Sequence, residues 1–582
     1  MSLTVRNVVV RGLGAVLCIA GTTTALAAQA KPLPLKYVGP ATVPAITAGD
    51  LMTRLYKYAD DSMGGRPVGT AEHLKAVAYV EREVRRLGLK PGGTNGSYYQ
   101  DFPIYHEVID PASVMTVSGA TVKFGEGFIA QNAASVANLP TLYVGDLADT
   151  TVAVDSAMAA GKLLIVRPLI NMQPDRAAAV QKSAAYLAYR HALAGAAGTL
   201  LILPDNLYPM YRNFYGQEQE SLTSAAAGAS MGKVSLIISE ATANLVLGAP
   251  AASATRGTAG QPVSANVTKT ETVGVPGRNV IAILPGTDPK LAGEYVAIGA
   301  HSDHIAIQNP PREHDSLKVY NEFGRPAGQE GGRNLQKNPI SADEWTKINA
   351  DIAAMRKVYP ARLDSISNGA DDDGSGTVSV LEIAEAFAKG TVKPKRSIIF
   401  VWHAGEERGM WGSGYFTANP TIPRDSIVAQ LNIDMVGRGE ASDETGVAKD
   451  GTVLHGSPGY LQLVGSRRLS TELGDLVESV NTRNHHNITF DYSEDADGHP
   501  QDIYCRSDHW SYAKWNIPVV FFTTGGHADY HQVTDEPQYI QYGHMARVDS
   551  LIFDVAEAVA NLDHAPVVDG KKMADPNGAC RQ

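Results

Sequence analysis

The stretch "SIIFVWHAGEE", residues 397–407, decides the fold that we expect for the larger part of this 582-residue chain. Its apolar run is unbroken, which is typical of a strand buried on both faces, and it ends in a pair of glutamates, Glu406 and Glu407. Four other runs repeat the pattern of apolar residues followed by polar ones: "NVIAILPG" (279–286), "EYVAIGAHSDH" (294–304), "VAQLNIDMVG" (428–437) and "IPVVFFTTGGH" (517–527). Helical patterns such as "TVSVLEIAEAFAKG" (377–390) lie between them. This alternation predicts an α/β fold with a mostly parallel mixed sheet and helices on both faces.

The polar residues that follow these strands are carboxylates and imidazoles. They are His301 and Asp303, Glu406 and Glu407, Asp434, and His531 in "DYHQVTDEP". Ligands of open α/β sheets gather at the carboxyl ends of the strands, so we expect these side chains to converge on one crevice. Nitrogen and oxygen donors of this kind suit a pair of zinc ions that keep positions open for water and substrate.

A second stretch, "NGADDDGSGTVSVLE" (368–382), allows two interpretations. It has the layout of a calcium-binding EF-hand loop, with oxygen side chains or glycine at the required places: Asp371, Asp373, Ser375, Gly376 and Glu382. An EF-hand also needs a helix before the loop, and the preceding segment contains Pro360 and Gly369 and no sustained helical pattern. We therefore expect an aspartate that bridges the metal pair, with Glu382 as a solvent-facing or packing carboxylate.

Six motifs, in order, resemble the M28 family of zinc peptidases, which includes secreted bacterial aminopeptidases. They are "AHSDH", "GADDDGSG", "WHAGEERGMWGSGYF", "NIDMVG", "SDHW" and "YHQVTDEP", and a family-like start, "YADDSMGGRPVGTAEHLKAVAYVEREVRRLGLKP", precedes them. The resemblance covers most of residues 46–560. It implies a zinc-exopeptidase fold of the phosphorylase/hydrolase-like type. The β-rich segment 114–273 looks like the protease-associated domain that many members carry.

The resemblance also implies a role for individual residues. The implied metal ligands form two groups that share one aspartate: His301, Asp372 and Asp434 for one zinc, and Asp372, Glu407 and His531 for the other. Glu406 would be the general base, and Tyr530 would polarise the carbonyl group of the substrate. Asp303 would orient His301 through the ring N–H of the histidine.

Changes in composition, together with what the family resemblance implies, divide the chain into five expected parts. They are a signal peptide (1–30), the N-terminal part of a catalytic domain (31–113), an inserted protease-associated domain (114–273), the catalytic peptidase domain (274–565) and a C-terminal tail (566–582). Residues 46–61 and 70–89 have the periodicity of amphipathic helices. The polar residues 305–367 interrupt the strand pattern, so we expect a surface excursion near the site, such as a lid.

The start of the sequence and its cysteines bear on the compartment. Residues 1–30 have the order of a secretory signal peptide, with cleavage expected after Ala27 or Ala30, which predicts a periplasmic or extracellular protein. The apolar run is too short for a stable membrane span. Cys505 and Cys580 would form one disulfide or remain two thiols. The net charge of −11 argues against a nucleic-acid partner.

These features predict an exported di-zinc exopeptidase that removes N-terminal residues from peptides. The same machinery would serve a dipeptidase or carboxypeptidase, which needs Arg or Lys for the terminal carboxylate, whereas an aminopeptidase needs acidic groups for the ammonium. Glu406 and Asp434 can supply the acidic groups, which favours the aminopeptidase. A glutaminyl cyclase and a non-catalytic, receptor-like binding protein are less favoured, because every ligand position is filled. The sequence leaves the oligomeric state and the residue preference open.

Overall fold

The computed structural model describes residues 33–582 apart from 131, 152–153, 171–173, 223–232, 306, 329–332, 334 and 336–337. The expected signal peptide, residues 1–30, lies outside the described residues. Within that described part, none of the helices combines the length and the apolar character that crossing a bilayer requires.

The apolar runs of the sequence form one central sheet. In order across the sheet the strands are β1 (Lys90–Pro91), β14 (Gly277–Leu284), β18 (Ser397–His403), β15 (Tyr295–His301), β19 (Ile427–Ile433), β24 (Val519–Thr523), β22 (Tyr460–Val464) and β23 (Thr489–Asp491), and β2 (Tyr99–Phe102) also pairs with β14. The middle strands β18, β15, β19 and β24 run parallel to one another. Both neighbours of this group, β14 and β22, run antiparallel to it.

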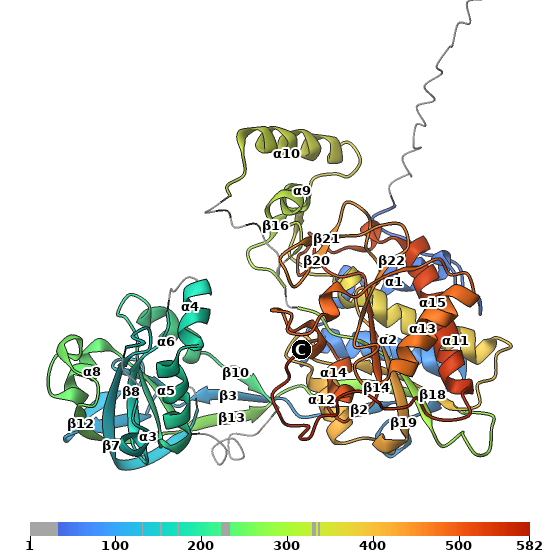
Figure 1. The fold of residues 1–582 in the computed structure, drawn as a ribbon. Coiled ribbons are helices and arrows are strands. Elements are labelled where there is room, and N and C mark those ends of the chain that lie inside the picture. The colour runs from blue at the N-terminus through green and yellow to red at the C-terminus, as the bar shows by residue number, and fades with distance from the viewer. Residues whose placement is uncertain are drawn as a thin grey trace, which may run out of the picture.

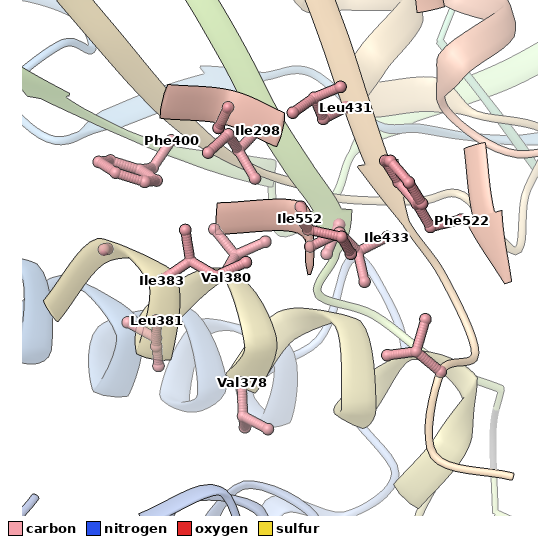
Figure 2. Close-up of a cluster of buried hydrophobic side chains, with 14 of the residues drawn as sticks. Ile298, Val378, Val380, Leu381, Ile383, Phe400, Leu431, Ile433, Phe522 and Ile552 are labelled. Atoms are coloured by element: carbon pink, nitrogen blue, oxygen red, sulfur yellow. The ribbon is translucent and has the colours of Figure 1, made fainter. Parts of the chain in front are cut away.

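Helices cover the central sheet on both sides (Figure 1). They are α1 (Ala48–Tyr58), α2 (Ala71–Leu87), α11 (Gly376–Lys389), α12 (Trp411–Ala418), α13 (Thr471–Arg483), α14 (His509–Ala513) and α15 (Tyr542–Asn561). Helix α11 is apolar on most of its surface because it is enclosed between the sheet and other helices. Figure 2 shows its Val380 and Ile383 beside Ile298 and Phe400 of the sheet.

The side chains of β18 show why this strand reads as an unbroken apolar run. Ile398, Phe400 and Trp402 belong to a hydrophobic cluster that includes residues of α11 and α15. Ile399 and Val401 point to the other face and join a second cluster with residues of α12 and α14. Alternate residues of a strand face opposite sides of a sheet, so a strand covered on both sides must be apolar throughout. The expected α/β fold is confirmed.

A second sheet lies apart from the first in the chain and in space (Figure 1). Its strands, in order, are β5 (Ala120–Lys123), β4 (Val114–Val117), β12 (Ala259–Val267), β7 (Ala134–Asp146), β8 (Leu163–Arg167), β9 (Gly198–Ile202), β11 (Val234–Ile238) and β6 (Phe128–Ala130). Among its described residues are the helices α3 (Ser156–Ala159), α4 (Pro174–Gln181), α5 (Ala184–Gly195), α6 (Tyr208–Tyr215) and α8 (Glu240–Leu247). Its assignment as a protease-associated domain stays a prediction.

A small sheet joins the second sheet to the rest of the protein, and we call it the stalk. It consists of β10 (Gln219–Ser221), β3 (Tyr105–Ile109) and β13 (Lys269–Val273), with β3 in the middle. Strands β3 and β13 are antiparallel neighbours, and Tyr105 pairs with Val273. The chain therefore enters and leaves the segment at adjacent places. Glu220 of β10 also pairs with Arg408, with 3.2 Å between Oε2 and Nη2.

The polar segment 305–367 contributes two further helices. They are α9 (His314–Gly324) and α10 (Ala342–Met355), and short strands β16 (Arg312–Glu313) and β17 (Leu363–Asp364) pair at its base. Another short hairpin, β20 (Glu444–Val447) and β21 (Val453–His455), lies beyond β19 in the chain. In Figure 1, α9 and α10 stand above the edge of the central sheet near this hairpin.

Candidate metal centre

The strand ends of the central sheet bring the predicted site residues together. His301 is the last residue of β15, Glu406 and Glu407 follow β18, Asp434 follows β19, and His531 lies in the loop after β24. These four strands are parallel neighbours, so their carboxyl ends meet at one edge. A short helical segment, η4 (Ala370–Ser375), delivers Asp372 to the same place immediately before α11.

Asp372 stands between two groups of donor atoms. Its Oδ1 is 3.2 Å from Nε2 of His301, and its Oδ2 is 3.0 Å from Nε2 of His531. Asp434 Oδ1 is 3.6 Å from the same nitrogen of His301, and Glu407 Oε2 is 3.0 Å from that of His531. Each group is compact enough for its donor atoms to surround one cation. The two oxygens of one carboxylate thus face the two different groups.

The neighbouring aspartates have other partners. Asp371 Oδ1 accepts a hydrogen bond of 2.6 Å from the backbone N–H of Gly437. Asp373 accepts one of 2.8 Å from the N–H of Gly376 and one of 3.1 Å from the N–H of His301. Asp371 Oδ2 also lies 3.3 Å from Nε2 of His527. These contacts leave Asp372 as the aspartate that faces both His301 and His531.

The calcium-loop interpretation fails on the position of Glu382. Its carboxylate is buried against the guanidinium of Arg54, with 2.9 Å between Oε2 and Nε. The residues before Asp371 form a loop and the short strand β17 rather than a helix. Of the two roles expected for Glu382, packing is confirmed and exposure to solvent is wrong.

The electrostatics of the centre suit the binding of cations. Burial alone would raise the pKa of Asp372, but the histidines around it hold that pKa well below the usual value. Burial alone would lower the pKa of His531, yet the carboxylates of Asp372 and Glu407 raise it to about 10. Buried carboxylates thus draw positive charge onto the imidazoles. A divalent cation on the ring nitrogens would supply that charge instead.

The donor set fits zinc, which binds imidazole nitrogen and carboxylate oxygen. His314, Asp364 and Glu536 form another buried group of possible donors among the described residues. In that group, however, Arg362 pairs with both carboxylates. Its Nη1 lies 2.8 Å from Oδ2 of Asp364, and its Nη2 pairs with Glu536. A guanidinium already neutralises that group, whereas at Asp372 the carboxylates pair with imidazoles.

The role expected for Asp303 needs a correction. Nδ1 of His301 is 3.0 Å from the backbone carbonyl oxygen of Asp303 and 3.8 Å from its carboxylate. The backbone therefore orients the ring, leaving Nε2 toward Asp372. The carboxylate instead accepts hydrogen bonds of 2.6 Å from the N–H of Gly405 and 3.2 Å from the N–H of Glu406. Asp303 thus fixes the turn that carries Glu406 and Glu407.

Two residues of the site escaped the sequence analysis. His304 is buried, and its Nδ1 lies 2.8 Å from Oε1 of Glu407, so it orients that carboxylate and adds a fourth donor to the group around His531. Its place directly after Asp303 in "AHSDH" was the available signal. Ser507 donates a hydrogen bond of 2.6 Å to Oδ2 of Asp434. Its place as the first residue of the motif "SDHW" was the available signal, although its partner lies 73 residues away in the sequence.

A pocket of about 820 Å³, counting its open mouth, lies beside the centre. Asp372, Glu406, Asp434 and Tyr530 line it on the side of the centre, and Phe521 contributes to its apolar part. Burial raises the pKa of Glu406 well above the usual value, and the nearby carboxylates add to this effect while His301 opposes it. A half-buried glutamate with a raised pKa is suited to accept and return a proton near neutral pH.

The last residues of the sequence hold one wall of this pocket. Cys505 and Cys580 form a disulfide, which decides between the two expectations for these cysteines. Gln582 accepts a hydrogen bond of 2.9 Å from the N–H of Tyr504 and donates to the carbonyl oxygens of Glu494 and Ala496. Glu494, Gln501, Ile503 and Arg506 of the segment so fastened all line the pocket.

Replacing Cys580 by serine is therefore expected to act on the pocket more than on the metal centre. We expect a KM several-fold higher and a kcat within about threefold of the wild type. We also expect a stability loss of about 2–4 kcal/mol, because the bridge no longer restricts the unfolded chain. Steady-state kinetics and thermal melting test this. An unchanged KM at a lowered melting temperature would show that the bridge stabilises the fold without shaping the pocket.

The model of peptidase family M28 matches residues 279–556, which include every predicted metal ligand. This part of the chain belongs to peptidase family M28. The M28 region thus extends from β14 through most of α15, and the second sheet lies before it in the chain.

Curated relatives match the chain over limited lengths. Leucine aminopeptidase 1 of Aspergillus fumigatus is 29% identical over 233 residues, which is 38% of this chain and 54% of the relative. The chain thus spans about half the length of that relative. Leupeptin-inactivating enzyme 1 of Streptomyces exfoliatus is 39% identical over 80 residues, or 13% of this chain and 18% of that enzyme.

Solved structures match over more of the chain but less closely. An aminopeptidase from Aneurinibacillus sp. strain AM-1 gives a TM-score of 0.43 at 16% identity, covering 90% of this chain and 96% of its own. BSAP, a zinc aminopeptidase from Bacillus subtilis, gives a TM-score of 0.41 at 14% identity, and the match covers 90% of this chain and 97% of the BSAP chain.

Proposed function

We propose that the chain is an exported, zinc-dependent aminopeptidase that holds two zinc ions. The observation that carries the proposal is the position of Asp372, whose two carboxylate oxygens face His301 on one side and His531 on the other. A carboxylate shared by two compact donor groups is what a pair of metal ions requires. Membership of the M28 region in a peptidase family supports the same conclusion.

The proposed ligands follow from the two groups. His301, Asp372 and Asp434 would hold one zinc, and Asp372, Glu407 and His531 the other, with His304 orienting Glu407. Bound zinc ions would lower the pKa of a water molecule and polarise the scissile carbonyl group. The protein orients its donors from fixed partners: the carbonyl of Asp303 for His301, and the hydroxyl of Ser507 for Asp434.

Two side chains of the pocket would carry the proton and the charge of the reaction. Glu406 would take a proton from the attacking water at its carboxylate and return it to the amine of the leaving peptide. The backbone contacts to Asp303 hold its turn in place for this transfer. The Tyr530 hydroxyl would donate a hydrogen bond to the oxygen of the carbonyl as negative charge develops there. Its pKa is raised well above the usual value by burial and by nearby carboxylates, so the hydroxyl keeps its proton.

The polar groups of the pocket favour the free amine as the end that is recognised. Glu406 and Asp434 line it and can pair with the ammonium of a peptide N-terminus. One observation keeps a second candidate open. Arg506 lines the same pocket, and a guanidinium is the group that a dipeptidase or carboxypeptidase needs for a terminal carboxylate.

Matched peptides decide between these candidates. We expect a leucyl peptide with a free amine to be cleaved faster than its N-acetylated form by on the order of 10²-fold or more, because blocking removes the charge that the carboxylates bind. Amidation of the C-terminus should change the rate little. Equal rates for free and blocked peptides would contradict the aminopeptidase, and loss of activity on C-terminal amidation would favour the second candidate.

Metal analysis tests the zinc ions separately. We expect about two zinc per chain after gentle purification, since each donor group suits one ion. A chain that keeps no zinc and cleaves no peptide would be a binding protein instead.

We also propose export, followed by removal of the signal peptide. The disulfide between Cys505 and Cys580 supports this, because such bridges persist in oxidising compartments. The intact mass of the protein recovered from a secreting host should equal that of a chain that begins directly after Ala27 or Ala30. An intact N-terminus in the cytoplasmic fraction would contradict export.

A further inference from the structure

The loop that carries Tyr530 and His531 is held in an unusual conformation. His531 has a φ of +60°, in the left-handed region that residues other than glycine seldom adopt. Such a conformation persists when surrounding contacts determine it. Inside the loop, hydrogen bonds run from the N–H of Gln532 to Asp529 and from that of Asp535 to Gln532. The question is what holds the loop from outside.

Asp529, directly before Tyr530, is the anchor of the loop. It is buried, and its Oδ2 pairs with Arg438 and, at 3.1 Å, with the ammonium of Lys318. Its Oδ1 accepts a hydrogen bond of 2.8 Å from the hydroxyl of Thr534, on the other side of His531. Both ends of the loop therefore meet at one carboxylate.

Lys318 and Asn321 approach this anchor from α9, one turn apart on the same helix face. Asn321 is fully buried and donates a hydrogen bond of 3.3 Å to the hydroxyl of Thr534. Lys318 is only 7% exposed, and its ammonium also lies over the ring of Tyr539, 5.1 Å from the ring centre, and 3.1 Å from Glu322. Burying an ammonium is costly unless it is paired, so the ion pair with Asp529 offsets the cost of burying Lys318.

The chain that follows α9 reaches the pocket itself. Ala327 lines the pocket, and a Cβ added to Gly328 would lie 3.0 Å from the Cβ of Tyr530. At this point the segment 305–367 lies against the tyrosine. It forms a wall of the site rather than a free excursion.

We propose that Lys318 and Asn321 are positioning residues for Tyr530 and His531, so that α9 is a working part of the active site. The inference rests on the proposed function and deepens it. Without the ammonium, Oδ2 of Asp529 would keep its ion pair with Arg438 and lose the one that α9 supplies. The loop would then lose the contact that fixes the hydroxyl of Tyr530 toward the substrate carbonyl and Nε2 of His531 toward Asp372.

A double-mutant cycle tests the link to Tyr530. Lys318→Met should lower kcat by roughly tenfold or more with little change in KM, because the tyrosine acts on the transition state. In a Tyr530→Phe background, with both variants assayed at saturating Zn²⁺ so that weaker binding at His531 does not lower turnover, the same substitution should change kcat by less than about twofold, since the tyrosine it positions is already gone. Lys318→Arg, which keeps the charge, should recover most of the activity. Equal losses in both backgrounds, or no loss at all, would overturn the inference.

A measurement without peptide separates this inference from the proposed function. Titration of Zn²⁺ against a chelator should show binding weakened by roughly tenfold in Lys318→Met, because His531 lies in the same loop. Lys357→Met, an exposed lysine of the same segment, is the matched control and should behave as the wild type. If the wild type binds zinc but hydrolyses no peptide, the proposed function fails. The zinc titration alone then tests whether Lys318 positions His531. If Lys318→Met does not fold, Asn321→Ala replaces it in both the double-mutant cycle and the zinc titration.

Discussion

Replacing Glu406 by glutamine is expected to lower kcat by roughly 10³–10⁴-fold while the zinc content stays that of the wild type. The substitution keeps the size of the side chain and the backbone contacts of its turn to Asp303. It removes only the carboxylate that accepts the proton of the attacking water. Glu406 lines the pocket without belonging to either donor group, so the metal ligands are untouched. Peptide-release kinetics and metal analysis on the same preparation measure both quantities.

Glu440→Gln is the matched control for this variant. Glu440 is an exposed glutamate beyond the end of β19, and its substitution should leave both turnover and metal content unchanged. A Glu406→Gln protein with near wild-type kcat would remove Glu406 from the mechanism. A variant that loses its zinc would instead make Glu406 a ligand.

Replacing Asp372 by alanine is expected to empty the centre of both ions. Asp372 faces both donor groups, so its removal takes one ligand from each site at once. We expect zinc binding too weak to survive dialysis, and turnover lower by roughly 10⁴-fold or more, since the remaining donors are too few for a closed coordination shell. Added zinc should raise the melting temperature of the wild type and not that of the variant, because binding to the folded state alone stabilises it.

Glu382→Gln is the control variant for Asp372→Ala. This residue would be the twelfth position of a calcium loop, and the structure pairs it with Arg54. We expect a less stable protein that keeps its zinc, because the buried Arg54 loses one of its three carboxylate partners and no ligand of the centre is changed. If Asp372→Ala retained one full zinc per chain, the shared carboxylate would not be a bridge.

The central strands were predictable because burial on both faces leaves a continuous apolar run. The run 397–402 became β18, and the helical pattern of residues 70–89 became α2. The direction of the outer strands was not predictable in the same way. Strands β14 and β22 are as apolar as their neighbours, yet they run antiparallel to β18 and β24. Direction depends on the path of the connecting chain, which composition does not record.

The site was predictable where a residue ends a strand. His301, Glu407 and Asp434 stand at strand ends in the sequence and meet in the structure. The choice of Asp372 within three aspartates came from the family resemblance, and its physical reason appears only in space, where backbone N–H groups occupy both neighbours. Lys318 could not be found from sequence, since its partner Asp529 lies 211 residues away (529 − 318).

The stalk has a consequence for how this architecture can change. Because β3 and β13 are adjacent, only a short turn between Ile104 and Gly274, whose backbone groups already share a hydrogen bond of 2.9 Å, would be needed to close the chain without residues 105–273. The whole segment can therefore be inserted, deleted or replaced without changing the order or the pairing of the strands in the central sheet. Such an exchange would remove the ion pair from Glu220 to Arg408, one residue beyond Glu407, and the packing of Leu222 against the cluster that contains Ala404.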